Sequence, residues 1–125
     1  MTENELSRII VDLCLKIHKR LGPGLLESVY EEVLCYELSV LGISFKRQIG
    51  MPVVYGAVKL ESGFRADLIV EDKVIMELKS VETILDVHKK QLLTYLRLTH
   101  LKLGLLINFN VALLKDGIKR IVNNL

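Results

Sequence analysis

The chain has 125 residues, a length that suits one domain with a single hydrophobic core. Hydrophobic residues make up 50% and charged residues 26% of the sequence, which excludes an intrinsically disordered chain. The 17 Lys and Arg residues and 15 Asp and Glu residues give a net charge of +2, too small for a strongly basic protein that coats nucleic acid. We therefore expect one domain over residues 1–125.

No apolar run reaches the roughly 18 residues that a membrane-spanning helix needs, because Asp12, Lys16 and His18 interrupt the most apolar stretch. The opening letters MTENEL lack the basic and apolar segments of a secretory signal, so a cytoplasmic protein is expected. Cys14 and Cys35 occur singly inside helical patterns, which predicts reduced core thiols rather than a disulfide or a zinc site.

Two helices are predicted before the first strand. Thr2 and Glu5 have the spacing of a capping box, and the apolar residues that follow keep helical spacing over residues 3–21. The turn-forming letters GPG come next. A second helical pattern then covers residues 25–41, with Gly42 as its stop signal.

The second half of the chain predicts strands around a third helix. Alternation and β-branched residues predict a three-stranded meander with strands near 45–55, 64–70 and 73–79. A helix over 87–100, with Asp86 as its N-cap, precedes the continuous apolar run LKLGLLINF, which suits a buried and parallel strand. The tail predicts a turn and then either a short edge strand or a final helix. The order ααβββαβ describes a mixed α/β domain.

The segment RADLIVEDKVIMELKS, residues 65–80, combines an apolar hairpin with charged side chains. Strict alternation makes one face of this hairpin wholly apolar; that face comprises Ala66, Leu68, Val70, Val74, Met76 and Leu78. The opposite face comprises Arg65, Asp67, Ile69, Ile75, Glu77 and Lys79.

One strand register keeps the two apolar stretches together. It places Ile69 opposite Ile75 and Asp67 opposite Glu77, joined by a three-residue loop. Directly opposed like charges are about 5 Å apart and repel each other. A bound divalent cation would explain the pair of carboxylates, and a solvated polar face balanced by Lys79 would explain it equally well.

Several motifs together resemble a known family. Asp67, with Glu77 ten residues later and Lys79 two residues beyond, resembles the PD-(D/E)XK nuclease superfamily, although Ala66 stands where the name of the superfamily has proline. GLLESVY at 24–30 resembles the G-x-x-E-x-x-Y signature of a family of small bacterial proteins placed in that superfamily, and KRQ and QLLTY further along agree with it. The resemblance implies a restriction-endonuclease-like αβββαβ core with an extra N-terminal helix and a central mixed sheet flanked by helices.

The resemblance also implies a site for Mg²⁺ or Mn²⁺. Its ligands would be Glu27, Asp67, Glu77 and the backbone carbonyl of Leu78. Hard cations of this kind prefer oxygen ligands. Lys79 would orient the nucleophile or support the charge that develops on the phosphate.

Two further groups of residues are candidates for the site. Gln91 and Tyr95 are four residues apart, share a helix face and resemble the Q-x-x-x-Y element of exonuclease branches of the superfamily. Candidate contacts to the nucleic-acid backbone are Lys46, Arg47, His88, Lys89 and Lys90, for which solvated surface charge is the competing explanation.

The function implied by the resemblance is metal-dependent hydrolysis of nucleic-acid phosphodiester bonds, with DNA as the expected substrate. A domain this small would cut a duplex more easily as a homodimer, so a homodimer is one expected arrangement. The alternatives are a non-catalytic nucleic-acid-binding or regulatory module that retains the fold, and a subunit that is active only with a partner.

Overall fold

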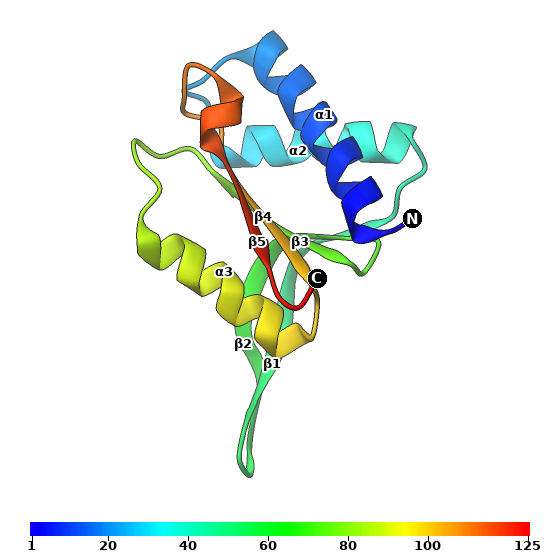
Figure 1. The fold of residues 1–125 in the computed structure, drawn as a ribbon, viewed down its shortest axis with the longest axis vertical. Coiled ribbons are helices and arrows are strands. Elements are labelled where there is room, and N and C mark those ends of the chain that lie inside the picture. Colours follow the sequence, from blue (N-terminus) through cyan, green and yellow to red (C-terminus); the bar gives the residue numbers. More distant parts are fainter.

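The computed structural model describes residues 1–125, apart from the side chain of Ser62. Its helices are α1 (Glu3–Leu21), α2 (Glu27–Val40) and α3 (Asp86–Thr99), with a short 3-10 helix η1 (Leu114–Gly117) near the end (Figure 1). Its strands are β1 (Phe45–Tyr55), β2 (Val58–Val70), β3 (Val74–Lys79), β4 (Leu103–Asn108) and β5 (Ile118–Val122). Within the described part of the chain, no helix has both the length and the hydropathy to cross a membrane.

The strands form one mixed sheet in the order β1-β2-β3-β4-β5. Neighbours from β1 to β3 are antiparallel, as expected for a meander. β3 and β4 run parallel, and α3 forms the connection between them. β5 pairs antiparallel with β4 and forms the far edge, so the tail ends in the edge strand rather than in a helix. The expected order ααβββαβ is confirmed.

Helices cover both faces of the sheet (Figure 1). α1 and α2 pack on one face over the larger core, which includes Leu68 and Leu78. α3 covers the other face, where Leu92 packs with Ile75 in a smaller core. Gly104 in β4 lets α3 come close, because a Cβ there would lie only 2.8 Å from the side chain of Leu92. Both sides of the charged hairpin are therefore covered by helices.

The faces of β2 exchange at Asp67. Leu68 packs under α1 and α2 as expected, but Ala66 packs with Ile69 under α3. The prediction that Ala66 shares the face of Leu68 was wrong. Strict alternation fails where the Asp67 carboxylate accepts the backbone N–H of Leu78 and where Gln48 of β1 has a left-handed backbone.

β1 and β2 continue beyond the body of the protein as a two-stranded ribbon (Figure 1). β2 begins at Val58, so the predicted start at residue 64 was too late. The side chains near the tip are exposed, with Tyr55 at 83% and Val58 at 56%. Backbone pairing forms this part of the ribbon without a buried face, so no clear hydrophobic pattern marked it in the sequence.

Helices α2 and α3 begin at residues other than those expected. α2 begins at Glu27 rather than at residue 25, and Leu26 holds its N-cap position. α3 begins at Asp86 with Leu85 at its N-cap, so the expected capping role of Asp86 was wrong. His88 contributes instead, because its Nδ1 accepts the Leu85 N–H at 3.0 Å. Thr2 caps α1 as predicted and accepts the N–H of the residue three positions on.

Cys14 and Cys35 are buried free thiols in the core beside α1 and α2, as predicted for core cysteines. Burial raises the pKa of the Cys14 thiol to about 12 and that of Cys35 to about 11. Because the thiolate is the reactive form, both residues act as packing groups.

Tyr30 fixes the turn between α1 and α2. Its ring is fully buried and stacks on Phe109, with ring centroids 4.2 Å apart. Its hydroxyl donates to the Gly22 carbonyl at 2.6 Å and accepts the Leu25 N–H at 3.2 Å. One side chain thus satisfies two backbone groups of the segment that leads to Glu27.

Replacing Tyr30 by Phe should lower the free energy of unfolding by about 1–3 kcal/mol, because the change removes the hydroxyl that bonds the Gly22 carbonyl and the Leu25 N–H. Urea denaturation measures this. Tyr36→Phe is the matched control, since Tyr36 is 66% exposed and its change should stay within about 0.5 kcal/mol. Equal losses in the two variants would contradict the role given to the Tyr30 hydroxyl.

Candidate active site

β2 and β3 separate at the position of Asp67. The predicted register is confirmed where Ile69 pairs with Ile75. The paired residues end at Leu68 and Met76, so the predicted pairing of Asp67 with Glu77 does not form. At the next position, Asp67 Oδ2 accepts the Leu78 N–H at 2.9 Å in place of a backbone carbonyl. A side-chain carboxylate is thus part of the connection between the two strands.

Glu77 is a buried acid beside Asp67. Its residue exposure is 9%, and its Oε1 is buried without a hydrogen-bond partner among the described residues. The pKa of Glu77 is raised to about 9, mainly by burial and then by the negative charge of Asp67 and a side-chain hydrogen bond with it, while Lys79 opposes the rise. For Glu77, the alternative of a solvated polar face does not hold, because the residue is buried on the side of the sheet that α3 covers.

Tyr95 on α3 lies near the two acids. Burial raises the pKa of its hydroxyl, the charges of Glu77 and Asp67 add to this effect, and a hydrogen bond from Gln91 opposes it. The Tyr95 ring stacks on Phe64 of β2, with ring centroids 4.0 Å apart and planes 11° from parallel. The structure therefore brings Gln91 and Tyr95 together beside the acidic pair.

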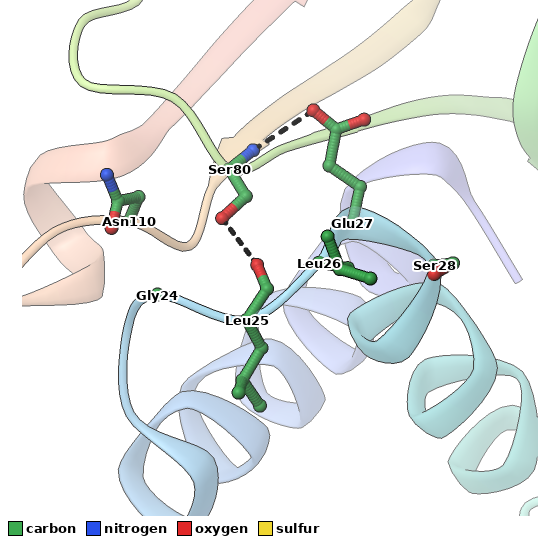
Figure 2. A pocket seen from close by; sticks show the side chains of 7 residues that line it. All are labelled: Gly24, Leu25, Leu26, Glu27, Ser28, Ser80 and Asn110. Carbon is green, nitrogen blue, oxygen red and sulfur yellow. Dashed lines mark hydrogen bonds between the residues drawn. The ribbon is translucent and has the colours of Figure 1, made fainter.

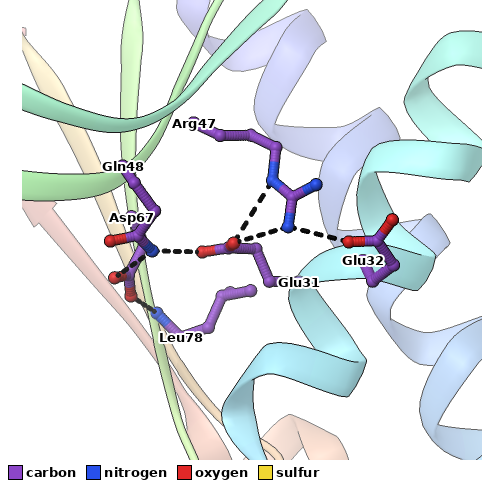
Figure 3. Close-up of polar contacts among 6 residues, drawn as sticks. All are labelled: Glu31, Glu32, Arg47, Gln48, Asp67 and Leu78. Atoms are coloured by element: carbon purple, nitrogen blue, oxygen red, sulfur yellow. Dashed lines mark hydrogen bonds and ion pairs between the residues drawn. The ribbon is translucent and has the colours of Figure 1, made fainter.

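A polar network connects Asp67 to α2 (Figure 3). Gln48 Nε2 donates to Glu31 Oε1 at 2.7 Å and to Asp67 Oδ1 at 3.3 Å. Arg47 donates to Glu31 Oε2 from Nη2 at 2.9 Å, and the same nitrogen pairs with Glu32 at 2.9 Å. Glu31, at 6% exposure, is thus a buried acid with three donor contacts.

Glu27 lies at the edge of the site, at the start of α2. Its Oε1 accepts the Ser80 N–H at 3.2 Å, and the Ser80 hydroxyl donates to the Leu25 carbonyl at 2.7 Å (Figure 2). An open pocket of about 520 Å³ adjoins these groups; it is lined by Gly24, Leu25, Leu26, Glu27, Ser28, Ser80 and Asn110. Glu27 therefore sits next to the residue that follows Lys79.

Four of the five candidate phosphate contacts have polar partners within the protein. Lys46 pairs with Asp72 at 3.0 Å, and Arg47 is engaged by Glu31 and Glu32. Lys89 lies 3.9 Å from Asp86, and His88 caps α3. Lys90 is exposed on α3, immediately before Gln91.

The acidic pair has the chemistry of a cation site. Glu77 Oε1 is a buried oxygen without a partner among the described residues, and a divalent ion would satisfy it and offset the repulsion from Asp67. Across the described side chains, no three acidic, His or Cys residues gather closely enough to enclose one ion. Glu27 is thus not gathered with Asp67 and Glu77 into a closed ligand set in this structure.

The site predicted from the sequence did not include Glu31, Gln48 or Phe64. Glu31 lies one turn after Glu27 on α2, so its position on the same helix face was the available signal. Gln48 was part of a family resemblance but had no assigned role. Phe64 could not be linked to Tyr95 from spacing, because they belong to elements distant in the chain.

Comparison with known proteins gives one result. A family model described as PD-(D/E)XK nuclease superfamily matches residues 4–121, nearly the whole chain. No curated protein and no solved structure matches the chain. The matched range contains all the acidic, lysine, glutamine and tyrosine side chains of the candidate site.

The raised pKa of Glu77 predicts how stability depends on pH without metal. Between its ordinary value of 4.5 and about 9, the carboxyl stays protonated in the folded state and ionises in the unfolded chain. The free energy of unfolding should therefore fall as pH rises through this window, by up to about 1.4 kcal/mol per pH unit from this group.

Urea denaturation in EDTA from pH 5 to 8 checks this for the wild type and Glu77→Gln. The variant should lose that part of the slope and be the more stable protein at pH 8. Glu61→Gln, at an exposed position, should follow the wild-type slope. Parallel curves for the wild type and Glu77→Gln would contradict the buried neutral state of Glu77.

Proposed function

The chain belongs to the PD-(D/E)XK nuclease superfamily, and we propose that it hydrolyses nucleic-acid phosphodiester bonds in the cytoplasm with Mg²⁺ or Mn²⁺. One observation supports this most: the buried Glu77 carboxylate lies beside Asp67 and has an oxygen without a partner among the described residues. A structural acid would be expected to have its hydrogen bonds satisfied. This arrangement suits an acid that receives its partner from solution.

The proposed ligands are Asp67, Glu77 and the backbone carbonyl of Leu78, with Glu27 at the outer edge. All four supply oxygen, as Mg²⁺ and Mn²⁺ prefer. A bound ion of this kind lowers the pKa of its water and stabilises charge on the phosphate.

Lys79, Gln91 and Tyr95 would act on the substrate. Lys79 lies close enough to Glu77 to lower its pKa, and its ammonium would orient the nucleophile or support the charge on the phosphate. Gln91 would position Lys79 or the scissile phosphate. Tyr95, held by Phe64 and Gln91, would pack behind the site or contact the nucleic-acid backbone.

Membership of the superfamily implies a nucleic-acid substrate. We propose DNA, with Lys46, Arg47, His88, Lys89 and Lys90 as contacts to the phosphates around the site. Such contacts give affinity without sequence readout. A homodimer would place two sites on one duplex.

A second function is favoured by the position of Glu27. Its carboxylate accepts a backbone N–H from Ser80 and is not gathered with Asp67 and Glu77. A non-catalytic nucleic-acid-binding or regulatory module, or a subunit that needs a partner to complete its site, would fit that arrangement.

The purified protein should cleave at least one member of a panel of labelled single-stranded and duplex DNA and RNA in Mg²⁺ or Mn²⁺. EDTA should abolish cleavage. Asp67→Asn and Lys79→Ala should each lower the rate by about 10²–10³, the loss typical when one charge-stabilising group is removed.

Lys102→Ala is the matched control for Lys79→Ala. Lys102 is exposed and precedes β4, at the opposite end of the sheet from Lys79, so its rate should equal that of the wild type. Cleavage that survives both site substitutions would reveal a contaminating nuclease and contradict the proposal. Tight binding without cleavage would favour the non-catalytic module instead.

A further inference from the structure

Gln48 has an unusual backbone conformation beside the site. Its φ of 47° lies in the left-handed region, although it belongs to strand β1. The pairing of β1 with β2 passes from Arg47–Leu68 to Ile49–Ala66 without including it. A non-glycine residue rarely adopts this conformation unless its surroundings maintain it.

In this conformation the Gln48 side chain contacts two acidic residues. A glutamine amide nitrogen has two N–H donors, and a carboxylate only accepts. The Gln48 nitrogen lies 2.7 Å from Glu31 Oε1 and 3.3 Å from Asp67 Oδ1, so one group connects two acids (Figure 3). The two Asp67 oxygens are then both occupied, one by Gln48 and the other by the Leu78 N–H.

Glu31 is itself held in place. It is buried on α2, and Arg47 donates to its other oxygen from both Nε and Nη2, at 3.3 Å and 2.9 Å. The Arg47 guanidinium also pairs with Glu32 at 2.9 Å. Arg47 thus connects Glu32 to Glu31, and Gln48 connects Glu31 to Asp67.

We propose that Gln48 is a positioning residue: Glu31, fixed by Arg47, orients the Gln48 amide, which holds the Asp67 carboxylate in the orientation needed to bind the divalent ion. The claim that Asp67 binds an ion in this orientation rests on the proposed function. The orientation itself is a property of the metal-free chain. Gln48 is exposed and outside both cores, so its replacement leaves the core packing intact.

The metal-free test is amide hydrogen exchange in Gln48→Met, which keeps the length of the side chain and removes its donors. Exchange of the Leu78 N–H should become about fivefold faster, the change expected when one hydrogen bond is weakened, while the melting temperature stays near that of the wild type. The Met76 amide serves as internal reference. Lys59→Met, near the tip of the ribbon and away from the site, should leave Leu78 exchange unchanged. Unchanged exchange in Gln48→Met would overturn the positioning role.

The metal-dependent test is Mn²⁺ affinity by calorimetry. Gln48→Met should bind Mn²⁺ about tenfold more weakly, as is typical when a residue that orients a ligand is lost. Adding Glu31→Gln to Gln48→Met should change the affinity little further if Glu31 acts through Gln48. Equal affinities for the wild type and Gln48→Met would overturn the proposal. If the wild type binds no Mn²⁺, the proposed function fails, and Leu78 exchange alone decides whether Gln48 positions Asp67.

Discussion

The burial of the Glu77 carboxyl beside the charged Asp67 carboxylate is the constraint on which the site depends. Glu77 lies in a central strand beneath α3, so water cannot stabilise its charge, and Asp67 adds a second negative charge beside it. In the metal-free protein, Glu77 therefore keeps its proton over the neutral pH range, since its pKa is raised to about 9. An ion that binds only the folded chain would replace that proton and stabilise the fold by mass action.

The rest of the site holds the Asp67 carboxylate in one orientation. Where β2 leaves β3, the carboxylate takes the place of a backbone acceptor at Leu78, and Gln48 occupies its other oxygen. The cost of this arrangement is a left-handed residue in β1 and a break in the alternation of β2. Local departures of this kind are typical of functional sites, because the surrounding core maintains a geometry that isolated strands would not adopt.

Alternation and residue spacing were sufficient for much of the fold, and insufficient for the contacts between distant elements. The register of β2 and β3 followed from keeping Leu68 and Met76 on one buried face, and the three-residue loop followed from that register. The orientation of Ala66 did not follow, because the alternation of β2 breaks at Asp67, opposite the left-handed Gln48. The contact between Glu31 and Gln48 depends on how α2 packs over β1. The spacing of residues along α2 does not predict the distance between α2 and β1.

The protonation state of Glu77 tests the account most directly. Carbon-13 NMR of protein labelled at the glutamate carboxyl groups, with Glu77→Gln to assign the signal, would follow its titration with and without saturating Mg²⁺. The expected result is a pKa near 9 in EDTA and a fully ionised Glu77 at neutral pH with Mg²⁺ bound. A Glu77 that titrates near 4.5 in EDTA, or a titration that Mg²⁺ does not change, would contradict it.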